Sequence, residues 1–137
     1  MKNMILLLLT IPFLAFTIQD DRSKLVGKWK GEDEKEVGYF IFDKEGYASI
    51  EVGGQTLGGK DFIIDGVKMS MTFEVRRVEG QMEVDLIAVS EREDLNRKVL
   101  CIAKFIDENT MEFAIDFTGI RPAGFDEENS IILTREP

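Results

Sequence analysis

The chain has 137 residues, of which 44% are hydrophobic and 31% are charged, and its formal net charge is −9. This length fits a single domain, and the apolar fraction, with ten phenylalanines, is sufficient for a buried core. Because binding to nucleic acid or to an anionic membrane needs a basic face, the acidity argues against both partners.

The N-terminus has the layout of an export signal. A positive start precedes an apolar run over residues 4–16, which is too short to span a bilayer, and small residues follow. We therefore expect a signal peptide over residues 1–19, cleaved near residues 17–19, and export to the periplasm or the outside of the cell. An uncleaved membrane anchor and a hydrophobic core helix are the alternatives. Residues 20–137 would form one domain.

Residues 25–31 form the first predicted strand and contain the only tryptophan. Leu25, Gly27 and Trp29 alternate onto one face, and lysines occupy the other. The strand therefore has an apolar and a solvated side, and a barrel or sandwich could close on it.

Turn residues define the hairpins that follow. Residues 44–46 predict a first hairpin in which Phe40 lies opposite Ile50, and the glycine-rich residues 53–59 are expected to form a mobile loop. The turns at residues 65–66 and 79–80 are strong two-residue hairpin signals, and they agree on which face is apolar. These two turns predict the pairs Ile64 with Val67, Phe62 with Met69, Val75 with Val84, Phe73 with Leu86 and Met71 with Ala88.

The next predicted turn, at residues 107–110, is rich in side chains that bond their own backbone. It predicts the pairs Ile106 with Met111, Lys104 with Phe113 and Ile102 with Ile115. In this register Lys104 lies on the apolar face, whereas Cys101 and Phe105 point outward. A last strand is predicted at residues 130–135.

Nine candidate strands follow the signal, and no stretch has the helical period. Short sequential connections favour an antiparallel up-and-down meander, and closure into a barrel removes its exposed edges. The predicted fold class is therefore all-β, with a barrel of about eight to nine strands.

The segment Gly27-Lys28-Trp29 resembles the G-x-W signature of the lipocalins. The resemblance implies that Gly27 and Trp29 form the closed end of the barrel, where an arginine packs over the tryptophan. Arg135 fits this position, and Arg121 is a second candidate. Together with Arg121-Pro122, Phe125 and the closing residues 133–136, the chain is similar to bacterial exported lipocalin-like domains of unassigned function.

The residue types restrict the available chemistry. Histidine is absent and Cys101 is the only cysteine, which excludes imidazole chemistry and cysteine-cluster zinc sites. No carboxylate pair is predicted inside the barrel, where burial could raise a pKa. We therefore expect no catalytic residue, no metal, no cofactor and no enzymatic activity.

The predicted interior suggests a monomeric carrier of a small hydrophobic or amphipathic ligand. Lys104 would either extend to the barrel mouth or face an anionic head group. The expected lining residues are Phe40, Phe42, Met71, Phe73, Leu86, Lys104, Phe113 and Ile115. The alternative is a packed-core structural or protein-interaction module of the cell envelope.

Overall fold

The computed structural model describes residues 21–31, 37–116 and 118–137. The predicted signal peptide lies outside the described residues, among which no helix has the length and apolarity needed to cross a membrane. The elements are β1 (Gly27–Gly31), β2 (Val37–Phe42), β3 (Ala48–Val52), β4 (Gln55–Gly58), β5 (Phe62–Ile64), β6 (Val67–Val78), β7 (Gln81–Ser90), the 3₁₀ turn η1 (Glu93–Leu95), β8 (Arg97–Asp107), β9 (Thr110–Asp116) and β10 (Ser130–Arg135).

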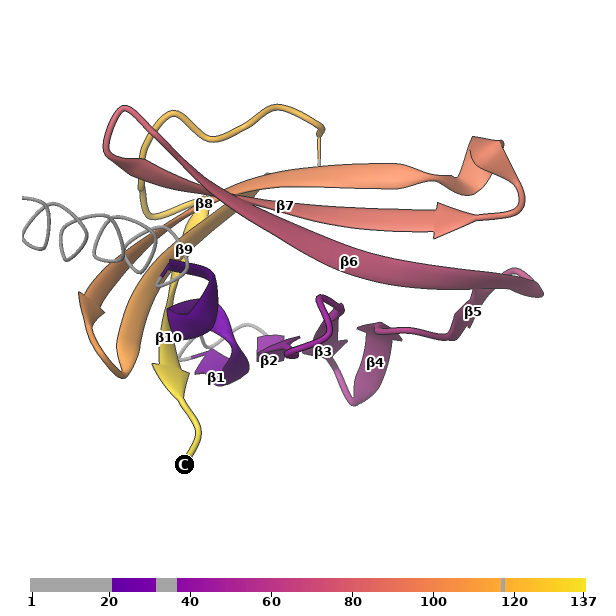
Figure 1. Cartoon of the computed structure of the whole chain (residues 1–137), viewed down its shortest axis with the longest axis horizontal. Coiled ribbons are helices and arrows are strands. Elements are labelled where there is room, and N and C mark those ends of the chain that lie inside the picture. The colour runs from indigo at the N-terminus through magenta and orange to yellow at the C-terminus, as the bar shows by residue number, and fades with distance from the viewer. Residues whose placement is uncertain (1–20, 32–36, 117) are drawn as a thin grey trace, which may run out of the picture.

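These strands form one antiparallel sheet that curls into a nearly closed barrel (Figure 1). The strand order is β4-β3-β2-β1-β10-β9-β8-β7-β6-β5, so the first and last strands pair in the middle of the meander. The all-β meander predicted from the sequence is confirmed, with ten strands in the part of the chain that the structure describes. The additional strand is β4, because the predicted mobile loop instead forms a hairpin in which Gln55 pairs with Val52.

Backbone hydrogen bonds from β6 to the segments that flank β3 and β4 join the two edges of the sheet. The amide of Met71 donates to the Gly59 carbonyl (2.8 Å), and the amide of Phe73 donates to the Gly46 carbonyl (3.0 Å). Gly58 is buried at this seam with a φ of +112°, and a Cβ atom there would lie 2.6 Å from the Met71 methyl group. Only glycine fits this approach without a shift of its neighbours.

The sequence-predicted pairs on both sides of β6 are confirmed. Both turns use two residues with positive φ: 51° and 79° at Asp65 and Gly66, and 51° and 83° at Glu79 and Gly80. This left-handed pair matches the twist of the flanking strands and specifies the register directly.

The predicted register of β8 and β9 is wrong beyond their turn. Asp107 pairs with Thr110, as the turn requires, but Phe105 pairs with Met111 because a bulge interrupts β8 between Phe105 and Asp107. One extra residue in a strand turns every later side chain to the opposite face.

The bulge exchanges the positions of Lys104 and Phe105. Lys104 is exposed on the outer face opposite Glu112, whereas Phe105 points inward with its ring 6.0 Å from that of Trp29. Cys101 is likewise inside and fully buried. The exchange keeps an ammonium group in water and covers an aromatic ring, which accounts for the observed register.

Aromatic side chains fill the middle of the barrel. The rings of Phe40 and Phe113 lie 5.0 Å apart, as do those of Phe42 and Phe73. The buried cluster consists of Leu25, Trp29, Phe40, Phe42, Ala48, Met71, Phe73, Met82, Val84, Leu86, Cys101, Ala103, Met111, Phe113 and Leu133.

Candidate ligand site at the open end of the barrel

The two ends of the barrel differ in how they are covered. We call the end with the turns at residues 79–80 and 108–109 the closed end, since the helical turn at residues 21–25 lies against it. Arg77 at the β6–β7 turn forms two hydrogen bonds of 2.8 and 2.9 Å with Asp21 of that helical turn.

Trp29 is the centre of the closed end and is fully buried. Its indole nitrogen donates to the Leu25 carbonyl (2.8 Å), and the Arg135 guanidinium lies 4.2 Å from its ring centroid. Arg135 also donates to the Val26 carbonyl (2.8 Å). Leu25 therefore ends the helical turn rather than starting the first strand, which begins at Gly27.

Gly27 makes room for this cover. Its φ is +145°, and a Cβ atom would lie 2.6 Å from a nitrogen of the Arg135 guanidinium. In the G-x-W segment, Gly27 thus leaves space for the Arg135 guanidinium, and Trp29 supplies the ring that this guanidinium covers.

Arg121 lies elsewhere, on the outer face of the sheet. Its guanidinium contacts Asp85 (2.8 Å) and Glu83 (3.4 Å) and donates to the Cys101 carbonyl (3.0 Å). These contacts hold the connection between β9 and β10 against the outer face of β7 and β8.

Asp85 is a fully buried carboxylate on this outer face. Arg76 of β6 contacts it at 3.0 Å and Lys98 of β8 at 3.5 Å, in addition to Arg121. Burial acts to raise the pKa of Asp85, but the hydrogen bonds from Arg121 and Arg76 outweigh it and lower the pKa. The carboxylate therefore stays ionised and binds three separate elements together.

The predicted lining residues form a packed core. Phe40, Phe42, Met71, Phe73, Leu86 and Phe113 are at most 8% exposed and belong to the buried cluster, against which Ile115 packs. Lys104 lies outside the barrel. The side chains that the sequence predicts to line a ligand cavity thus pack against one another and fill the middle of the barrel.

The Cys101 thiol is enclosed by this core. Burial, with a smaller effect of Asp85, raises the pKa of Cys101 to about 12. At neutral pH the sulfur is therefore protonated and weakly nucleophilic. Among the described residues, no three cysteine or carboxylate side chains are grouped so that they could hold a metal ion.

The opposite end, which we call the open end, carries the turns at residues 53–54 and 65–66 and the connection at residues 91–96. Here apolar side chains on the inner face remain exposed: Val52 is 38% exposed and Leu57 45%. Leu57 pairs with Ile50, which pairs with Phe40 of the core, so the register places all three on one face.

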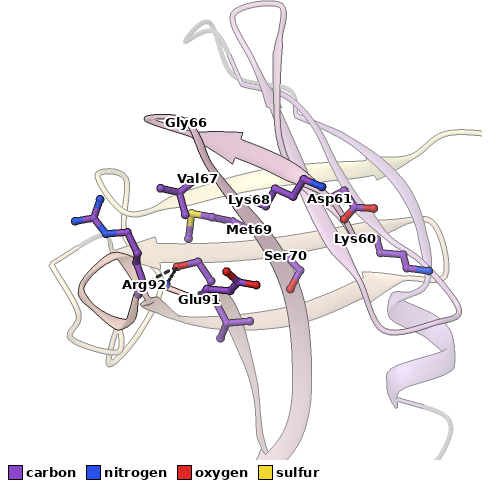
Figure 2. A pocket seen from close by; sticks show the side chains of 11 residues that line it. Lys60, Asp61, Gly66, Val67, Lys68, Met69, Ser70, Glu91 and Arg92 are labelled. Atoms are coloured by element: carbon purple, nitrogen blue, oxygen red, sulfur yellow. Dashed lines mark hydrogen bonds between the residues drawn. The ribbon is translucent and has the colours of Figure 1, made fainter.

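A groove of about 680 Å³ lies at this end of the barrel, at the start of β6 (Figure 2). Val67 and Met69 extend to one side of β6, and Lys68 extends to the other. The lining residues are Lys60, Asp61, Gly66, Val67, Lys68, Met69, Ser70, Val89, Ser90, Glu91 and Arg92.

Neither a protein-family model, nor a curated protein, nor a solved structure matches this chain. The nearly closed antiparallel barrel is compatible with the lipocalin-like architecture that the G-x-W segment suggested. The candidate site therefore depends on the geometry of the open end.

Proposed function

We propose that this protein is an exported, monomeric, lipocalin-like barrel that binds a small hydrophobic or amphipathic molecule at its open end and catalyses no reaction. The proposal rests on one observation: the inner face that is sealed around Trp29 is left exposed at Val52 and Leu57. A groove of about 680 Å³ at the same end has the size of known small-molecule sites, which range from about 300 to 1,000 Å³.

Binding of a neutral lipophilic dye, N-phenyl-1-naphthylamine, tests this proposal. We expect Leu57→Gln to weaken dye binding about fivefold, since a half-exposed leucine has about 1 kcal/mol of transfer free energy left to gain when a ligand covers it. Ile132→Gln is the matched control, because Ile132 is 38% exposed on the outer face opposite Glu112. Absence of dye binding, or equal losses in both variants, would contradict the proposal.

Native mass spectrometry of protein purified from its own host supplies a second test. A bound molecule that dissociates on mild activation, and that is depleted in Leu57→Gln, is the expected result. An apo mass in every preparation would count against a carrier.

The packed interior favours a second candidate, a structural or protein-interaction module of the cell envelope. The aromatic side chains predicted to line a ligand instead contact one another, and Ile63 and Ile120 expose 65% and 69% of their surfaces. Exposed apolar side chains of this kind can contact a partner protein. Crosslinking in envelope fractions tests this candidate: a reproducible partner, lost in Ile63→Ser, would support it.

A further inference from the structure

Three arginines lie on the inner face of the described strands, and the register identifies them. The pairs are Arg77 with Met82, Arg135 with Trp29 and Arg97 with Ala88. The first two stand at the closed end, where Arg77 binds Asp21 and Arg135 covers Trp29. Both of these guanidinium groups already have a partner in the fold.

Arg97 stands at the open end and differs from both. Its Nη1 atom donates to the carbonyls of Asp94 (3.0 Å) and Asn96 (2.8 Å) in the connection before β8. Among the residues that the structure describes, no carboxylate forms an ion pair with Arg97, which is exposed. A guanidinium has five N–H donors, so donors remain available on Nε and Nη2.

The neighbours of Arg97 on the inner face are apolar. Ala88 lies between Arg97 and Met71, and the next row towards the core is Phe73, Leu86 and Val99. In the other direction, Met69 pairs with Ser90, and both line the groove. The register therefore places Arg97 on the inner face, between the apolar core and the strand positions that line the groove.

We propose that the ligand is a small amphipathic anion, with its carboxylate or phosphate bound by Arg97 and its apolar part against the partly buried Ala88 and Val99. This inference rests on the proposed function, and it adds the charge and the orientation of the ligand. The guanidinium matches both anions because its donors lie in one plane and can bind two oxygens at once. Arg97 takes the role that the sequence suggested for Lys104.

The magnitude of the effect follows from the exposure of Arg97. An exposed ion pair contributes up to about 1 kcal/mol, which corresponds to about a fivefold change in Kd, and salt weakens it. We therefore expect an amphipathic acid to bind about fivefold more tightly than the alcohol of equal chain length at low ionic strength, and a smaller difference in 0.5 M NaCl.

Displacement of N-phenyl-1-naphthylamine provides the test, with decanoate, decyl phosphate, decanol and decyltrimethylammonium as probes and inorganic phosphate as the free anion. Arg97→Gln should remove the preference for decanoate and decyl phosphate and leave the Kd of decanol unchanged. Arg97→Lys should restore part of the preference, because it keeps the charge without the planar pair of donors. Lys104→Gln, on the outer face, is the matched control and should behave as the unmodified protein.

The outcomes separate the two proposals. If decanol and decanoate bind equally in the unmodified protein, or if Arg97→Gln weakens both to the same extent, the anion inference is wrong and binding at the open end stands. If none of the four amphiphiles displaces the dye, both proposals fail. If inorganic phosphate competes as well as decyl phosphate, Arg97 binds a free anion, and the amphipathic ligand is excluded.

Discussion

The closed and open ends of the barrel are built from the same strands, but their apolar and arginine side chains differ in burial and in contacts. At the closed end, Trp29 is fully buried, and Arg135 stacks on its indole and binds backbone carbonyls. At the open end, Leu57 is 45% exposed, and Arg97 forms no ion pair with the described residues. Side chains that complete their contacts inside the fold contribute to stability, whereas those left exposed on the inner face can contribute to binding. Substitutions at the two ends should therefore separate stability from ligand affinity.

Replacement of Trp29 should give the largest loss of stability. Trp29→Ala removes a fully buried indole together with its hydrogen bond to Leu25, which should lower the free energy of unfolding by about 3–5 kcal/mol. Thermal denaturation followed by circular dichroism measures the change, with Ile132→Ala as the exposed control. An unchanged melting temperature would mean that the closed end does not hold the barrel together.

Replacement of Asp85, the buried carboxylate on the outer face, should give the next largest loss of stability. Asp85→Asn leaves Arg76, Lys98 and Arg121 without their common carboxylate, and we expect a loss of about 2 kcal/mol, because these partners are partly exposed to solvent. Urea unfolding measures the loss. Glu74→Gln is the control, since Glu74 lies opposite Asp85 but is exposed. Equal losses in both variants would rule out a special role for the buried carboxylate.

The same residue predicts a pH dependence. Because the folded-state pKa of Asp85 is lowered, its contribution to stability is present above the unfolded-state value of about 3.9 and is lost as the pH falls through the folded-state pKa. The stability of the unmodified protein should therefore fall more steeply than that of Asp85→Asn below about pH 4. Parallel curves from urea unfolding at pH 2 to 6 would contradict the lowered pKa.

A pair of neighbouring substitutions tests the bulge in β8. Phe105→Ala should cost about 2 kcal/mol, because the ring packs against the core near Trp29, whereas Lys104→Ala should stay within about 0.5 kcal/mol. Chemical denaturation of both variants measures the difference. A larger loss for Lys104→Ala than for Phe105→Ala would contradict the bulge and support the register without it.

The sequence predicts those features of the fold that neighbouring residues determine, and not those that depend on tertiary packing. The turns at Asp65-Gly66 and Glu79-Gly80 determine their registers locally, and the sequence predicts those registers correctly. The sequence also predicts the turn at residues 107–110, but the bulge in β8 beyond it depends on which of Lys104 and Phe105 the rest of the barrel buries. Such a choice depends on tertiary packing, and no local pattern specifies it.

The functional residues show the same limit. Arg121 and Asp85 are brought together by the long connection after β9, so pairing neighbouring strands could not reveal their contact. The sequence alone does not place Arg97 on a face of the sheet, because residues 91–96 carry no short turn signal that sets the register of β7 and β8. With that register known, alternation from Ala88 would have identified an arginine on the inner face.

The central claim is that a ligand binds at the open end and leaves the closed end unchanged. Amide and indole NMR shifts of isotope-labelled protein, titrated with decanoate, test it most directly, since the single indole N–H of Trp29 reports on the closed end. We predict saturable shifts at Val52, Leu57 and Arg97, with the indole signal unchanged. Shifts confined to Trp29 and Phe105, or none at the open end, would contradict the account.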